Sequence, residues 1–220
     1  MEIKVILNAV KKAFLDFKEA FTISKNSDQL FEVFSSSLKE SLGDYQTVYD
    51  YAWGKDSVNI DGVTKGYMPK KGDTVIMDIS VGKNGVWCDV CRTFFIGEVS
   101  KEQRKTFELI KKSLRTGHLS LRAGVKASDI YNAVNAVYKK EGKTLVHHAG
   151  HKIGTEPLMQ PQFLSDNDNL VEEGQLYTIE SGLYEKYGIR LENNYLVTKE
   201  GAEDLFEELL PLKIEEYILK

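Results

Sequence analysis

The chain repeats one order of elements, helices followed by strands, at a spacing of about 100 residues. Apolar residues recur three and four apart over 3–42 and again over 102–141, which predicts two helices in each range. β-rich runs follow each pair of helices: DTVIMDI and VWCDVCRTFFI in the first half, QLYTIE and IRLENNYLVT in the second. The sequence therefore predicts an α/β (α+β) fold of two pseudo-symmetric halves, each with helices before strands.

The repeat also includes residues that begin helices and turns. Ser27 with Asp28, and Ser128 with Asp129, are predicted to cap the second helix of each half, because their side-chain oxygens can accept from free helix N–H groups. The turn-prone GKNG at 82–85 is predicted to join the first two strands. Such residues can match by chance, so they support the repeat only weakly.

Two pairs of acids fall in register across the repeat, and these are less easily matched by chance. Asp78 lies 102 residues before Glu180, and Asp89 lies 103 residues before Glu192. All of them occur in apolar runs that should form largely buried strands. An ionised carboxylate loses its hydration when buried, and several together also repel one another. Something cationic must therefore compensate these charges.

Two kinds of cation could do so. Arg92, Arg190 or lysines could form ordinary ion pairs with the acids. Alternatively, two divalent ions would balance four carboxylates, with one neutral imidazole completing the ligands. The paired register favours metal. A ligand set rich in oxygen with one nitrogen suits Mn, Co, Fe or Zn as divalent ions, rather than a structural zinc.

The imidazole is expected from the segment HHAGHKIG, which lies between the two pairs of acids. We favour His151 as the ligand over His147 and His148. Gly150 and Gly154 flank His151, and glycine allows the close backbone approach that such a site needs.

Composition limits the class of protein. The 220 residues show no linker rich in Pro, Gly or Ser, so residues 1–220 are expected to form a single domain. The formal charge of -4 and the lack of a clustered basic face argue against a nucleic-acid partner. The amphipathic opening segment argues against a signal peptide or a membrane partner, and the two cysteines, Cys88 and Cys91, suit a reducing cytoplasmic location.

The strings GDTVIMDIS, CDVCRTF, HHAGHKIG, EEGQLYTIESGLY and GIRLENNYLVTKEGAEDL together resemble the M24 metallopeptidases, the family of methionine aminopeptidases, Xaa-Pro dipeptidases and creatinase relatives. The resemblance extends over nearly the whole chain. It implies the pita-bread fold, with a dinuclear metal site between the halves. It also implies that Asp89 and Glu192 bridge two ions, and that five residues bind metal: Asp78, Asp89, His151, Glu180 and Glu192.

Two positions depart from the family pattern. The family has a histidine upstream of the first Asp ligand and another after the ligand histidine, and this chain has Asp61 and Leu158 there. In the family these histidines contact the scissile peptide and stabilise the tetrahedral intermediate. We therefore expect weak activity on ordinary dipeptides, with Asp61 binding a substrate ammonium instead. Arg190 fills a position typical of the dipeptidase branch.

The resemblance implies a metal-dependent hydrolase, like an Xaa-Pro dipeptidase or aminopeptidase, that cleaves a C–N (amide) bond. Glu180 is expected to carry a proton to the leaving nitrogen, and His147, His148, Leu158 and Arg190 are expected to contact the substrate. The expected partner is a small peptide or amino-acid-like substrate, and the chain is expected to be a monomer or homodimer. Two alternatives remain: a non-peptide substrate in a biosynthetic pathway, or a catalytically impaired metal-binding relative.

Overall fold

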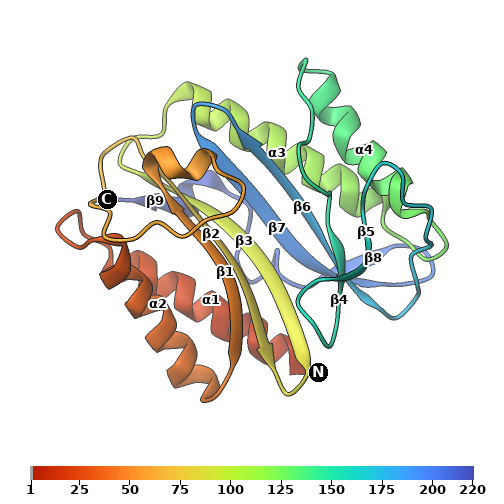
Figure 1. Cartoon of the computed structure of the whole chain (residues 1–220), viewed down its shortest axis with the longest axis horizontal. Coiled ribbons are helices and arrows are strands. Elements are labelled where there is room, and N and C mark those ends of the chain that lie inside the picture. Colours follow the sequence, from red (N-terminus) through yellow and green to blue (C-terminus); the bar gives the residue numbers. More distant parts are fainter. Residues whose placement is uncertain (1) are drawn as a thin grey trace.

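A computed structural model describes residues 2–220 and contains one nine-stranded sheet with helices behind it (Figure 1). The helices are α1 (Glu2–Ala20), α2 (Ser27–Leu42), α3 (Lys101–Ser120) and α4 (Ala127–Lys139), with the short 3₁₀ helices η1 (Gly54–Val58) and η2 (Ile214–Tyr217). The strands are β1 (Gln46–Trp53), β2 (Thr74–Lys83), β3 (Val86–Ile96), β4 (His151–Ile153), β5 (Met159–Gln162), β6 (Leu176–Tyr184), β7 (Gly188–Val197), β8 (Ala202–Asp204) and β9 (Ile218–Leu219).

The sheet joins the two halves predicted from the repeat. Its strand order is β1-β2-β3-β7-β6-β4-β5, with β8 beside β7 and β9 beside β3. The strands of the first half thus meet those of the second where β3 pairs with β7, at Cys91 and Glu192. The predicted order of two helices before strands, occurring twice, is confirmed.

The helices cover one face of the sheet because each has a single apolar stripe. α1 packs with Phe14 and Phe17 against Phe94 of β3, at ring-centroid distances of 5.9 and 5.2 Å. On the other half, Gly117 of α3 lies so close to Ile179 of β6 that a larger side chain would collide with it. The apolar side chains of the strands face these helices, which leaves the opposite face of the sheet open (Figure 1).

The predicted turn between β2 and β3 is confirmed. β2 ends at Lys83 and β3 begins at Val86. Asn84 and Gly85 between them have φ values of 52° and 76°. A two-residue hairpin turn with both residues at positive φ favours asparagine and glycine, because their backbones reach this region at little cost.

The two predicted helix caps were wrong by one or two residues. α2 is capped by Asn26, which accepts from the N–H of Gln29 at 3.0 Å, while Gln29 accepts from the N–H of Asn26. Ser27 instead donates its hydroxyl to the carbonyl of Thr64. The pair of Asn26 and Gln29 is a local capping box, three residues apart, whereas the contact of Ser27 with Thr64 joins residues far apart in the sequence.

α4 has no side-chain cap at its N-cap residue, Lys126. The carbonyls of Asn169 and Asn167 accept from the N–H groups of Ala127 and Ser128 instead. A returning loop therefore satisfies this helix end, which made a side-chain cap unnecessary.

Among residues 2–220, no helix has the length and apolar character required to cross a lipid bilayer.

Substituting Asn26→Ala tests the observed cap. The variant loses the oxygen that satisfies the start of α2, so we expect a loss of about 1 kcal/mol in unfolding free energy and a melting temperature about 2–4 °C lower. Lys126→Ala is the matched control, because that N-cap side chain makes no capping bond. Equal melting temperatures for Asn26→Ala and wild type would contradict the assignment.

Candidate metal centre

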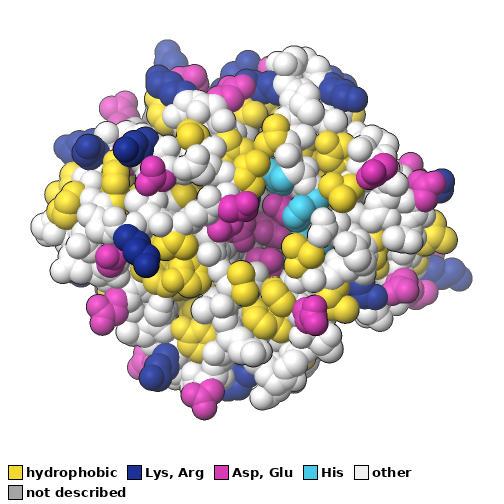
Figure 2. All heavy atoms as spheres, in the orientation of Figure 1, with side chains coloured by type: hydrophobic (Ala, Val, Ile, Leu, Met, Phe, Trp, Pro, Cys, Tyr) yellow, Lys and Arg dark blue, Asp and Glu magenta, His cyan; other side chains and the backbone are white. Residues whose placement is uncertain are grey.

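Acidic side chains gather in a hollow at the centre of the open face, with a histidine beside them (Figure 2). The hollow is a cavity of about 200 Å³. Six of the side chains that line it are carboxylates: Asp50, Asp61, Asp78, Asp89, Glu180 and Glu192. Arg190, His148 and His151 also line it.

Strand register brings four of these acids onto one face of the sheet. Asp78 pairs with Cys91, Cys91 pairs with Glu192, and Glu192 pairs with Glu180 across β2, β3, β7 and β6. Asp89 lies two residues before Cys91, and residues two apart on a strand share a face. The register alone therefore places the four predicted acids side by side.

Asp89 is held in place by a side chain on the neighbouring strand. The amide of Asn194 spans the gap between β3 and β7, accepting from the N–H of Asp89 at 2.9 Å and donating to its carbonyl. Asn194 is fully buried. It replaces the backbone ladder at the point where the two halves separate.

Gly150 brings the histidine segment against β6. It has a φ of 131°, and a Cβ at this position would collide with the backbone carbonyl of Thr178. The next N–H, that of His151, donates to the hydroxyl of Thr178 at 3.1 Å. The close backbone approach expected from this glycine is therefore present.

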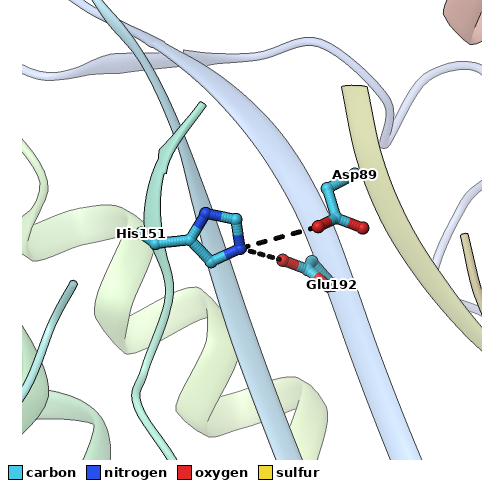
Figure 3. Close-up of side chains that lie close together, drawn as sticks. All are labelled: Asp89, His151 and Glu192. Atoms are coloured by element: carbon cyan, nitrogen blue, oxygen red, sulfur yellow. Dashed lines mark ion pairs between the residues drawn. The ribbon is translucent and has the colours of Figure 1, made fainter. Parts of the chain in front are cut away.

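His151 presents one nitrogen to two of the acids. Its Nδ1 lies 3.1 Å from the carbonyl oxygen of Lys152, which can only accept, so Nδ1 carries the proton. In the neutral ring Nε2 then carries a lone pair, and it lies 3.6 Å from Asp89 Oδ2 and 3.7 Å from Glu192 Oε1 (Figure 3). These separations are too long for hydrogen bonds.

The same three residues fit a metal ion. Two ligand atoms each about 2.1 Å from one ion lie about 3.0–3.5 Å apart in octahedral or tetrahedral arrangements. One ligand atom from each of Asp89, His151 and Glu192 lies within 4.8 Å of the others. Among the residues that the structure describes, buried Asp89 Oδ1 and Glu192 Oε1 have no hydrogen-bond partner. Buried, unpartnered acceptors facing one another are suited to a cation.

Arg190 is the alternative counter-ion proposed from the sequence, and it accounts for only part of the charge. Its Nε lies 2.9 Å from Asp78 Oδ2 and its Nη2 lies 3.1 Å from Asp50 Oδ2. Arg92, the other candidate, instead contacts neutral oxygens, among them the carbonyl of Glu192 at 2.7 Å. One guanidinium thus serves two carboxylates, and within residues 2–220 no arginine or lysine forms an ion pair with Asp89 or Glu192.

The pKa values record this excess of negative charge. Burial raises the pKa of Asp78 well above its ordinary value, opposed by Arg190 and reinforced by Asp89. Burial also raises the pKa of Glu192, and the charges of Asp89 and Glu180 raise it further. These carboxyls therefore retain protons at pH values where exposed acids are ionised. A divalent cation that displaced those protons would bind more tightly as the pH rises.

Glu180 differs because histidines surround it. Its Oε1 lies 2.8 Å from His148 Nδ1 and its Oε2 lies 3.4 Å from His147 Nδ1. Burial acts to raise the pKa of Glu180, but the charges of these histidines outweigh it and lower the pKa. Glu180 is thus ionised where Glu192 still holds a proton.

The structure separates the remaining predicted site residues into two groups. Asp61, Leu158 and His148 line the cavity together with Arg190. His147 is not among the lining residues, and its side chain is only 8% exposed. Its Nδ1 donates to the carbonyl of His148 at 2.6 Å and its Nε2 accepts from Tyr184 at 3.2 Å, so both ring nitrogens are occupied.

Two residues of the site, Asp50 and Asn194, were not predicted from the sequence. Asp50 lies in the apolar run TVYDYAW, so the signal that singled out Asp78, an acid inside a predicted strand, was also present there. The pairing of Asp50 with Asp78 across β1 and β2 places both carboxylates within reach of Arg190. Asn194 is a polar residue of ordinary type for a strand, and its role, bonding the backbone of Asp89 across β3 and β7, is visible only in the folded structure.

The amino-acid sequence matches a known protein family over most of its length. The sequence pattern of metallopeptidase family M24 matches residues 2–199. The chain belongs to this family. An uncharacterized peptidase of Methanocaldococcus jannaschii is 30% identical over 174 residues, which cover 74% of this chain and 49% of the relative. The Xaa-Pro dipeptidase of Pyrococcus furiosus is 27% identical over 158 residues, 70% of this chain and 45% of the relative.

Solved structures confirm the pita-bread fold. The prolidase from Pyrococcus furiosus superimposes with a TM-score of 0.87 at 24% identity, covering 93% of this chain and 62% of the prolidase. An X-Pro aminopeptidase from Thermotoga maritima also gives 0.87, at 21% identity, covering 93% of this chain and 59% of the aminopeptidase. The chain spans about half the length of the curated relatives it matches.

Glu192→Gln tests the electrostatic account in the metal-free protein. A carboxyl with a raised folded pKa contributes stability below its unfolded pKa of about 4.3, and this is lost as the pH rises through the folded pKa. The glutamine side chain stays neutral at every pH, so the variant is expected to melt at a higher temperature than wild type at pH 8 and to show a smaller gain at pH 5. With saturating Co(II) the order should reverse, because a ligand has been removed.

Calorimetry with and without a chelator measures both effects. The exposed acid Glu98 provides the control substitution Glu98→Gln, which should change neither melting temperature. Identical behaviour of Glu192→Gln and wild type in both conditions would contradict the repulsion and the ligand assignment together.

Proposed function

We propose that the chain is a hydrolase that uses two divalent metal ions to cleave a C–N amide bond in a small peptide or amino-acid derivative. The observation that carries this proposal is the buried cluster of Asp89, His151 and Glu192, with unpartnered oxygens facing a cavity. Asp78 and Glu180 flank this cluster on the adjoining strands. Relatives described as dipeptidases and as prolidases support this class of reaction.

In this proposal Asp78, Asp89, His151, Glu180 and Glu192 hold Mn, Co, Fe or Zn ions, and residues 1–220 act as one catalytic domain. The ions, when bound, would supply an activated water and polarise the carbonyl of the substrate. Arg190 orients Asp78 through the 2.9 Å contact with its Oδ2, and its charge opposes the burial that raises the pKa of this carboxyl. Glu180, ionised in its histidine surroundings, would accept a proton and pass it to the leaving nitrogen.

The cavity mouth supports recognition of a cationic substrate. Asp61 lies at the exposed end of the loop that follows η1, and the next residue, Gly62, donates its N–H to Asp50 Oδ1 at 3.1 Å. This bond holds the loop over the cavity. Asp61 makes no ion pair within residues 2–220, so its carboxylate is available for the free ammonium of a peptide or amino acid.

Asp61 and Leu158 also favour a second candidate, the hydrolysis of a non-peptide substrate. Leucine cannot donate a hydrogen bond to a developing oxyanion, and an ionised aspartate would repel one. Leu158 is 45% exposed at the cavity wall, next to Pro157. This apolar wall suits a substrate with a hydrocarbon group near the scissile bond.

We also propose a reducing cytoplasmic location, in keeping with the free, buried Cys88 and Cys91.

A dipeptide screen with added Mn(II) and Co(II), run beside elemental analysis, tests the proposed function. We expect metal-dependent turnover of Met-X or X-Pro dipeptides at least about 10²-fold below that of a family member with both histidines. The double variant Asp61→His with Leu158→His should be more active than Leu158→His alone, because residues that act as a unit are non-additive. Asp89→Ala, measured in parallel, should abolish turnover.

The outcomes separate the candidates. Efficient turnover by the wild-type chain would contradict the expected role of the missing histidines. Bound metal with no turnover of any dipeptide by wild type or double variant would favour the non-peptide substrate. A preparation that binds no metal under any condition would exclude both.

A further inference from the structure

His148 lies in the cavity wall beside Glu180, held there by the backbone. The N–H of Glu180 donates to the carbonyl of Ala149 at 3.1 Å, and the N–H of Ala149 donates to the carbonyl of Phe163 at 2.9 Å. This pairing continues the sheet past the start of β4 and sets the ring of His148 against the carboxylate of Glu180. The side chain of His148 is 24% exposed, on the cavity side.

The contact between His148 and Glu180 is close but is not a well-directed hydrogen bond. His148 Nδ1 lies 2.8 Å from Glu180 Oε1. Nevertheless, this buried Nδ1 has no hydrogen-bond partner among the described residues, because the carboxylate oxygen lies off the direction in which the ring nitrogen points. In a neutral ring, this Nδ1 and the carboxylate oxygen can therefore share a third atom, as two ligands of one cation do.

The separation of these two atoms matches two ligands of one ion. Ligand atoms about 2.1 Å from a metal and at right angles to each other are about 3 Å apart. The rings of His148 and His151 lie side by side, with centroids 5.4 Å apart, and both line the same cavity. His147 differs, because its two nitrogens are occupied by the carbonyl of His148 and by Tyr184.

We propose that His148 is a sixth protein ligand and binds, through Nδ1, the ion that Glu180 holds. The inference rests on the proposed metal-dependent function and extends it from five ligands to six. A second imidazole makes the donor set richer in nitrogen, which favours Co(II) and Zn(II) over Mn(II). His148 thereby takes part in selecting the metal.

The direct test uses protein carrying nitrogen-15-labelled histidine and loaded with cadmium-113. Scalar coupling between the metal and a ring nitrogen appears only where the two are bonded. We expect coupling at two nitrogens, Nε2 of His151 and Nδ1 of His148. His148→Phe keeps a planar ring without nitrogen and should retain only the coupling at His151. His118→Gln is the matched control, because His118 lies on α3 with its Nε2 at the carbonyl of Ala202, and should retain both couplings.

Metal affinity gives a second, independent measurement. In titrations of the metal-free protein, His148→Phe should bind Co(II) at least about tenfold more weakly at one ion while binding Mn(II) nearly as well as wild type. Equal melting temperatures of the metal-free proteins establish that the variant is folded, and His148→Ala replaces it if the larger ring disturbs packing.

The outcomes distinguish this inference from the proposed function. Cadmium coupling at His151 alone, with Co(II) affinity unchanged in His148→Phe, would overturn the sixth ligand and leave the metal-dependent hydrolase in place. Coupling at neither histidine would contradict both.

Discussion

Repulsion among buried carboxylates is the constraint on which the rest of this structure depends. Asp78, Asp89, Glu180 and Glu192 come from adjoining strands and face one cavity, where the loss of hydration makes each charge costly. Arg190 offsets part of this charge at Asp78, and His147 and His148 offset part at Glu180. Asp89 and Glu192 have only His151 beside them among the described residues, at 3.6 and 3.7 Å. Strand register fixes the positions of these acids. The register is stabilised in turn by the apolar side chains that pack between the sheet and the helices.

Three contacts of neighbouring residues hold the proposed metal ligands Asp89 and His151 in place. Asn194 bonds both backbone groups of Asp89, Gly150 lets the histidine segment touch β6, and the carbonyl of Lys152 sets the proton on His151. Each contact reduces the freedom of one proposed ligand before any ion binds. Such preorganisation is common around metals, where residues behind the ligands orient them. The site is therefore built for a cation even though its ligands repel one another.

The sequence was most informative where a residue contradicted its surroundings. Acids within apolar strands are costly, so Asp78 and Glu180 stood out, and their spacing fell in register with the repeat of helices and strands that predicted both halves of the fold. Asp50 carried the same signal, but its role depends on Arg190, which is 140 residues away. Lys126 shows the other limit, because the start of α4 is satisfied by the carbonyls of a distant loop. The cap at Asn26, in contrast, is a local pair with Gln29 that the residue types do signal. His147 and His148 are neighbours of one type, and only their contacts in the fold tell them apart.

The central claim is that these carboxylates are arranged around two divalent ions. Diffraction from crystals of the Co(II)-loaded protein, recorded on both sides of the cobalt absorption edge, tests this most directly. The account predicts two anomalous peaks in the cavity, one among Asp89, His151 and Glu192 and the other beside Glu180 or Asp78. Crystals grown with excess Co(II) that show no anomalous peak in this cavity would contradict it.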